Sequence, residues 1–332
     1  NTVILTVRGN AVSGFIQNGL ETYRIGASSA ADNRLFMLDL RALPADDVGG
    51  VPMGDGDAQA APNAEPAADN TVQDLLVVYN QAACNSAGSC SQLQADIVTA
   101  VADINSAYSE SGVNITMNLV GTTFTNYSGT GASATLSALA GTNDGQMDEI
   151  HQVRDDLGAD IVAMVYDGQG CGIGYSPSSA SSAFSVTDEP CLVGNRTRAH
   201  DIGHNQGALH DRKQHGGGTT GAYNYGYRRC SDGTDEDLGS PYFRTFMSYG
   251  CTGAPRVGRV SNPNVTYLGV AQGIDPAVNP SKGAWNARTL NESASYVAGF
   301  RTGTTPPTIP AAPSGLLASA NGPDSSDMSG GG

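Results

Sequence analysis

Apolar and polar residues alternate with two different periods in the middle of the chain. Residues 75–79 form a short apolar run suited to a buried strand, and residues 92–108 place apolar side chains at helical spacing. Residues 113–120 alternate as a strand does, residues 145–157 have the pattern of a polar helix, and residues 160–166 form a second apolar run. This order predicts an α/β sandwich with a twisted, mostly parallel sheet.

Three further elements are expected toward the C-terminal end of this region. Residues 183–186 are a candidate edge strand of the sheet. A helix is expected over residues 195–205, with Asn195 or Thr197 as its N-cap. The pattern of residues 285–300 predicts a closing C-terminal helix.

The segments that flank this organised region, residues 71–302, differ from it in composition. Residues 1–43 contain short alternating stretches separated by glycine turns, whereas residues 44–70 are rich in Ala, Asp, Gly and Pro and offer little to bury. Residues 303–332 are rich in Pro, Ser and Gly. We therefore expect linkers over residues 44–70 and 303–332, and the second can lead into a further module that is cut off here.

Charge and hydropathy argue against two classes of partner. The chain carries 17 basic and 32 acidic residues, a net charge of −15, and such a surface repels the phosphate backbone of nucleic acids. No apolar run reaches the ~18 residues that a membrane span needs. With 43 glycines and only 39% apolar residues, we expect a loop-rich chain.

Six cysteines form an even set whose pairing the count alone cannot settle; they are Cys84, Cys90, Cys171, Cys191, Cys230 and Cys251. We favour the scheme in which each cysteine pairs with its neighbour along the chain, because these loops are the shortest. No pair has C-x-x-C spacing, which disfavours a cysteine zinc site or a redox motif. Disulfides would indicate secretion to an extracellular, oxidising environment; reduced, buried thiols in a cytosolic protein are the alternative.

Three of the five histidines fall within eleven residues of the chain. His200 and His204 are four apart, so on a helix their rings project from one face, one turn apart. Gly207 can adopt a positive φ that ends the helix and turns the chain, and His210 can then approach the same point. Three imidazoles at this spacing predict a catalytic zinc site whose fourth position is left for water.

This window resembles the zinc signature of the metzincin proteases, H-E-x-x-H-x-x-G-x-x-H. Gly203, Asn205 and Asp211 make it similar to the reprolysin-like branch, which typically reads His-Glu-x-Gly-His-Asn-x-Gly-x-x-His-Asp. Residues 246–250 resemble the methionine turn of the family, with Met247 beneath the metal.

The resemblance implies a secreted bacterial zinc endopeptidase with a metzincin-type sandwich over residues 71–302, a monomer that acts on protein or peptide substrates. It makes residues 1–43 a pro-region fragment of a zymogen. Many metzincins cap the zinc with a pro-region cysteine, but no cysteine precedes Cys84, and a pro-region carboxylate is a candidate substitute. In astacin-like and serralysin-like relatives a tyrosine at the position of Tyr249 contacts the zinc or the reacting intermediate, so Tyr249 is a candidate oxyanion donor; a buried structural tyrosine is the alternative.

The main departure from the family pattern is Asp201, which stands where the family has the glutamate that acts as general base. Aspartate has the same chemistry but is one methylene shorter, and a misplacement of ~1 Å can cost ~10²-fold in rate. Asp201 is therefore either a working base in an active endopeptidase with a reduced rate, or the sign of a zinc-binding pseudo-protease or peptide-binding module with little turnover.

The sequence also offers a candidate calcium site, a candidate substrate-binding strand and two rival functional classes. The acidic run Asp232, Asp235, Glu236 and Asp237 could bind calcium, although it lacks EF-hand spacing and a solvated loop is the alternative. Residues 170–175 are expected on or near the sheet edge, where a substrate peptide can pair by strand addition. A zinc hydrolase for non-protein substrates and a structural zinc protein are the rivals; the second normally needs a fourth protein ligand.

Overall fold

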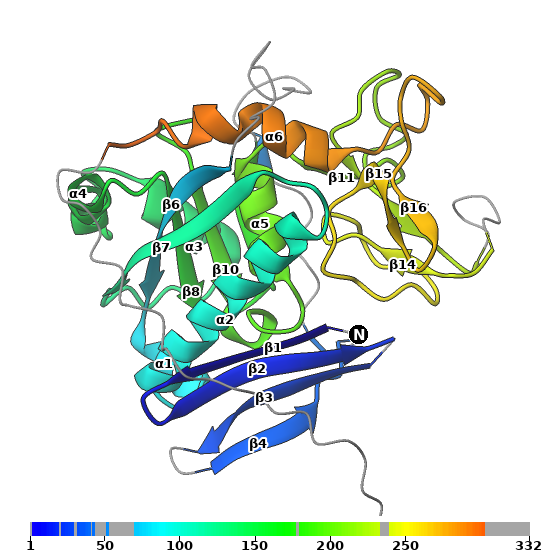
Figure 1. The fold of residues 1–332 in the computed structure, drawn as a ribbon. Coiled ribbons are helices and arrows are strands. Elements are labelled where there is room, and N and C mark those ends of the chain that lie inside the picture. Colours follow the sequence, from blue (N-terminus) through cyan, green and yellow to red (C-terminus); the bar gives the residue numbers. More distant parts are fainter. Residues whose placement is uncertain are drawn as a thin grey trace, which may run out of the picture.

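A six-stranded sheet forms the centre of the molecule. The computed structural model describes residues 2–19, 21–29, 32–40, 42–43, 51–52, 70–176, 179–232 and 239–302. The strands of the central sheet span Val51–Pro52 (β5), Thr71–Tyr79 (β6), Ile115–Phe124 (β7), Ile161–Tyr166 (β8), Gly172–Ser176 (β9) and Phe184–Asp188 (β10). Their order is β5-β9-β10-β8-β6-β7, and every pairing is parallel except that of β9 with β10 (Figure 1). The expected α/β fold with a mostly parallel sheet is confirmed.

Helices cover both faces of this sheet. They span Gln81–Ser86 (α1), Cys90–Ser109 (α2), Ala132–Ala140 (α3), Asp148–Leu157 (α4), Thr197–Asn205 (α5) and Asn286–Val297 (α6). Leu75 and Val77 of β6 belong to one buried cluster with residues of α2, α5 and α6. Leu76 and Val78 belong to a second cluster with residues of α3 and α4. Successive side chains of a strand point to opposite faces, and this alternation creates the two layers.

A separate four-stranded antiparallel sheet precedes the central one. Its strands, β1 (Thr2–Arg8), β2 (Ala11–Asn18), β3 (Glu21–Ser29) and β4 (Asp32–Met37), follow one another in sequence order. The sheet lies beneath the central fold and packs on α2 through β1 and β2 (Figure 1).

A lobe of short strands separates α5 from α6. It contains the pairs β11 (Leu209–Asp211) with β12 (Tyr225–Gly226), β13 (Arg228–Arg229) with β14 (Phe243–Arg244), and β15 (Asn262–Tyr267) with β16 (Val270–Gln272). A small apolar cluster that includes Tyr227, Phe243 and Val257 holds this lobe together.

The disulfides follow the local scheme. Cys84 bonds to Cys90, Cys171 to Cys191, and Cys230 to Cys251, and the part of the chain that the structure describes holds no free cysteine. Within the same ranges, no helix combines the length and apolar character that crossing a membrane would require.

Two local predictions were wrong. Residues 183–186 are not an edge strand, because β10 lies inside the sheet between β8 and β9. Helix α5 is not capped by Asn195 or Thr197: Arg196 holds the N-cap position with a φ of 63° and no side-chain capping bond. Helix α3 was not predicted. The linkers expected over residues 44–70 and 303–332 lie almost entirely outside the described residues.

Candidate metal centre

Helix α5 and the turn that follows it bring the three candidate histidines together. His200 and His204 lie on α5, and His210 lies on β11. Gly207, with a φ of 94°, reverses the chain between them, and its N–H donates to the carbonyl of His204 at 2.9 Å. The left-handed conformation costs glycine no steric energy, so this residue suits the bend.

The Nε2 atoms of the three histidines form a nearly equilateral triangle. The sides are 3.0 Å between His200 and His210, 3.1 Å between His200 and His204, and 2.9 Å between His204 and His210. A point ~2.0–2.1 Å from all three nitrogens exists, and this is the normal zinc–nitrogen distance. Among the described residues they are the one cluster of three or more such ligands with this geometry. The residues therefore fit a metal ion.

Hydrogen bonds at the opposite ring nitrogens orient two of these ligands. Nδ1 of His200 lies 2.9 Å from the carbonyl oxygen of Phe246, and Nδ1 of His204 lies 2.9 Å from that of Ala208. A carbonyl can only accept, so each Nδ1 carries the proton and each Nε2 keeps its lone pair for a metal. Burial, and with it the charge of His204, lowers the pKa of His200 well below its usual value.

Asp201 points from α5 toward strands β9 and β10 of the central sheet. Its side chain is buried, and its Oδ2 accepts a hydrogen bond from Oγ1 of Thr187 on β10 at 3.2 Å. Gly172 on β9 leaves room for this carboxylate, since a Cβ there would lie 2.3 Å from Oδ2. Arg198, one helical turn earlier, is fully buried; burial lowers its pKa to about 10, and the charge of Asp201 opposes that shift.

Met247 lies directly under α5. Its side chain is 1% exposed, and a Cβ on Gly203 would lie 2.6 Å from its sulfur. The turn around it is closed by a bond from the N–H of Ser248 to the carbonyl of Thr245 at 2.9 Å. Gly203 thus allows the methionine to approach the helix between its two histidines.

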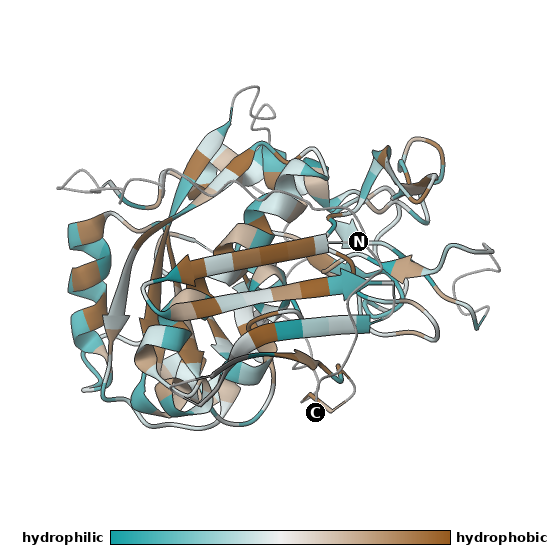
Figure 2. Cartoon of the chain, turned by 60° about the horizontal axis from the view of Figure 1, so that its bottom comes forward, coloured by the Kyte–Doolittle hydropathy of each residue, from teal (hydrophilic) through white to brown (hydrophobic). Residues whose placement is uncertain are grey.

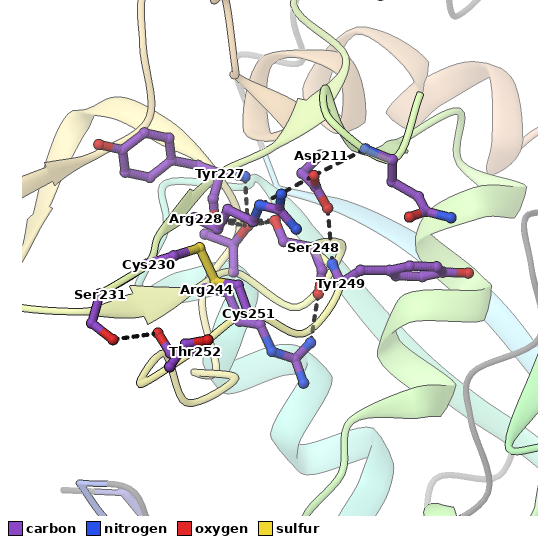
Figure 3. The surroundings of a disulfide bond; sticks show 12 residues. Asp211, Tyr227, Arg228, Cys230, Ser231, Arg244, Ser248, Tyr249, Cys251 and Thr252 are labelled. Atoms are coloured by element: carbon purple, nitrogen blue, oxygen red, sulfur yellow. Dashed lines mark hydrogen bonds and ion pairs between the residues drawn. A yellow bond between two sulfur atoms is a disulfide. The ribbon is translucent and has the colours of Figure 1, made fainter. Parts of the chain in front are cut away.

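Tyr249 lies beside the histidines and is anchored through its backbone. Its ring centroid is 4.4 Å from that of His210. Asp211, the residue after that histidine, accepts from the Tyr249 N–H at 3.0 Å and from the Gln214 N–H at 3.2 Å, and it pairs with Arg228 at 3.3 Å. The ring extends away from the Cys230–Cys251 disulfide (Figure 3). Asp211 anchors the loop, as expected.

A cleft of about 490 Å³ opens beside Tyr249. Its lining includes the cationic side chains of Lys213 and Arg228, the carboxylate of Asp232, and the segment from Gly250 to Thr252. Lys213 is exposed and is one of only two lysines in the chain.

The structure also tests the predicted calcium site and the two histidines outside the zinc motif. Of the acidic run proposed for calcium, only Asp232 is described, and it lines the cleft; calcium binding has no support here. His215 is exposed, as expected. His151, expected at the surface, is instead half-buried, and its Nε2 lies 2.6 Å from the carbonyl oxygen of Gly141.

Sequence reasoning missed several residues that shape the site. Gly172 and Thr187, which surround Asp201, belong to strands that lie 14 or more residues before it in sequence. The carbonyl oxygens of Phe246 and Ala208, which orient two of the histidine rings, belong to the backbone, so no residue type in the sequence marks them. A Gly-x-Gly pattern at 172–174 was the one available hint, since glycine in a strand often marks the close approach of another group.

Comparisons with known proteins agree on one family. Residues 69–275 match the family described as metallo-peptidase family M12B, reprolysin-like. A "Peptidyl-Asp metalloendopeptidase" of Stenotrophomonas maltophilia (strain R551-3) is 34% identical over 91% of this chain and 71% of its own length. A protein of the same name from Xanthomonas campestris pv. campestris is 33% identical over 91% and 70%. A chain in the solved "Structure of a chaperone-substrate complex" shares the fold, with a TM-score of 0.55 and 16% identity over 88% of this chain and 44% of that one.

Proposed function

This chain belongs to the reprolysin-like M12B metallopeptidases and is a metalloendopeptidase, and from that premise we propose that it cleaves extracellular proteins at aspartyl residues. The observation that carries the proposal is the triangle of Nε2 atoms with sides of 2.9–3.1 Å, flanked by Asp201 and Tyr249. His200, His204 and His210 would hold zinc, which when bound lowers the pKa of a coordinated water and polarises the peptide carbonyl.

Asp201 is the proposed general base. Its chemistry requires it to accept a proton from the attacking water and deliver it to the leaving amine. Thr187 donates to one carboxylate oxygen at 3.2 Å, which holds the group in place. Gly172 has no side chain, and this leaves room for the Asp201 carboxylate in the same position.

Tyr249 is the proposed donor to the developing oxyanion. Its ring is 4.4 Å from the ring of His210 and 6.2 Å from that of His200, so the side chain lies beside the triangle. A preorganised hydroxyl that strengthens its bond as charge develops lowers the barrier more than it strengthens substrate binding. The turn at Met247 is the proposed equivalent of the family's methionine turn.

The relatives' name supports an aspartyl preference, and cations near the site provide a physical basis for it. Arg256 and Arg244 lie close enough to His200 to lower the pKa of its ring. Lys213 lines the cleft beside Tyr249. In a chain of net charge −15, positive charge at this site favours an acidic substrate side chain, and the exposed Lys213 is the cation that such a side chain can reach.

The N-terminal region is proposed to be the pro-region of a secreted zymogen. Its residues Val51 and Pro52 pair with Tyr175 and Ser176 of β9, at the edge of the central sheet. A substrate peptide that binds by strand addition would need this edge. Three disulfides fit an oxidising compartment outside the cell.

A zinc-binding protein with little turnover is the second candidate, and the burial of Asp201 favours it. At 1% exposure, its carboxylate can reach a water only from within the site.

The test uses two peptides that differ only in having Asp or Asn at one position. Each is incubated with the purified protein, with the protein after chelation of its metal, and with the protein after zinc has been restored. We expect zinc-dependent cleavage of the Asp peptide, lost in Asp201→Ala with zinc content unchanged. Zinc binding without cleavage would leave only the second candidate, and a rate more than about tenfold higher in Asp201→Glu would show that the shorter side chain is misplaced.

A further inference from the structure

The N-terminal sheet contacts one continuous surface of the catalytic unit. We call this surface the docking face; it consists of Asp96 on α2, Glu189 in the short 3-10 turn Glu189–Cys191, and residues 194–196 before α5. The sheet lies below α2 and the start of α5 in Figure 1. Its position places it against the elements that carry the metal centre.

The side of the sheet that meets the docking face is mostly polar, with Phe15 as its large buried apolar residue. The buried residues of β2 and β3 include Ser13, Gln17, Thr22 and Arg24. The opposite side exposes large apolar residues, among them Val3, Leu5 and Val7 of β1, which are 64%, 57% and 51% exposed. Figure 2 shows β1, the strand that begins near the N label, brown over most of its length. Burial of apolar residues is therefore only part of what orients the sheet, and specific polar bonds contribute to its orientation.

Arg24 is the centre of those bonds. Its guanidinium donates to Asp96 at 2.9 Å and to Glu189 at 2.5 Å, and all three groups are buried. Burial raises the pKa of Asp96, and the charge of Arg24 opposes that shift. Without Arg24 the docking face would hold two neighbouring buried carboxylates with no cation between them, a costly arrangement.

Three more contacts connect the sheet to the catalytic unit, and one of them is at the start of the metal-binding helix. Phe15 packs under Arg196, the N-cap residue of α5, with the guanidinium 5.1 Å from the ring centre. Gln17 donates to the carbonyl of Arg256 at 2.7 Å. Gln92 of α2 in turn donates to the carbonyl of Val12 at 2.9 Å. The sheet thus stabilises the entry to α5 from outside the catalytic unit.

We infer that the N-terminal sheet is a non-covalent partner of the catalytic unit, held at the docking face by Arg24, and that it stays bound after the connecting segment is cut. Cleavage between residues 43 and 70 would then yield a two-chain complex rather than a free catalytic unit. The inference goes beyond the proposed function, and because it concerns association alone, it can fail or hold whether or not the protein cleaves aspartyl peptides.

The test uses the full chain with a site for a sequence-specific protease placed within residues 56–66 and an affinity tag at the C-terminal end. After cutting, capture and washing at micromolar concentration, we expect the N-terminal fragment to remain bound in a one-to-one ratio. Arg24→Ala should raise the dissociation constant by about 30-fold or more, because a buried charge loses its partner. Arg34→Ala removes the same charge from an exposed position on β4 and should change it less than about twofold.

A second variant keeps the test decisive if Arg24→Ala folds poorly. The double variant Asp96→Asn/Glu189→Gln replaces both buried carboxylates of the docking face with neutral amides. When Arg24→Ala is added to this background, no buried charge is left without a partner, so Arg24→Ala should weaken binding much less there than in the wild-type background. The inference is overturned if the wild-type fragments separate on cutting, or if Arg24→Ala has the same effect in both backgrounds.

Discussion

Gly172→Ala tests whether the placement of Asp201 against β9 matters for catalysis. The added methyl group would lie 2.3 Å from Oδ2 of Asp201, 2.7 Å from Cγ2 of Thr197 and 2.7 Å from the carbonyl oxygen of Val186. The clash with the Val186 oxygen requires a small adjustment of the sheet backbone, and the clash with Asp201 requires its carboxylate to give way. It has to shift by about 1 Å to regain an ordinary contact, and a shift of that size costs ~10²-fold in rate.

The same change should have a moderate effect on stability and none on the metal. Overpacking of a filled interior costs about 1–3 kcal/mol, which lowers the melting temperature by about 2–4 °C for each kcal/mol in a domain of this size. None of the three nearest atoms that a Cβ at Gly172 would meet belongs to His200, His204 or His210. The zinc content should therefore remain at one equivalent.

The assay is kcat/KM on an aspartyl peptide, measured together with zinc content and thermal unfolding. Gly131→Ala is the matched control, because a Cβ there meets nothing within 4 Å. A Gly172→Ala protein that keeps wild-type zinc and a kcat/KM within about threefold of wild type would refute the assignment of Asp201 as the base.

Three further predictions concern the site and its surroundings. Tyr249→Phe should lower kcat by about 10²-fold with zinc content unchanged, since it removes an oxyanion donor and keeps the ring; an unchanged kcat would make Tyr249 structural. Lys213→Ala should raise KM for an aspartyl peptide by about two- to fivefold, the worth of an exposed charge pair, whereas Lys282→Ala should not; equal effects would remove the cleft from substrate recognition. Burial raises the pKa of Asp188 from 3.8 to about 6, so the folded state retains this proton while the unfolded state loses it, and stability should fall as pH rises from about 4 to about 6. Asp188→Asn keeps the acceptor for the Gly168 N–H and should flatten this part of a plot of melting temperature against pH; an unaltered slope would contradict the assignment.

The histidine triangle shows how much local sequence can determine. His200, His204 and His210 lie within one helix and one turn, so the helical period and the glycine at 207 already specify their relative directions. The three disulfides were predictable for the same reason, because each closes a loop of at most 21 residues. The helices and strands with a clear apolar period, such as α2 and β8, also form where that period places them.

Contacts between distant segments had to be seen in three dimensions. Whether Asp201 is a base depends on where β9 and β10 lie, and the motif around it contains no information about either strand. The position of β10 inside the sheet, between β8 and β9, depends on an antiparallel pairing that follows a loop. The docking of the N-terminal sheet depends on Arg24 meeting two acids that lie 72 and 165 residues away. Sequence periodicity determined which residues could hold a metal, because ligand spacing is a property of one helix and its turn. Only the tertiary structure decided what surrounds that metal, because those neighbours come from separate elements whose relative positions are set by packing of the whole chain.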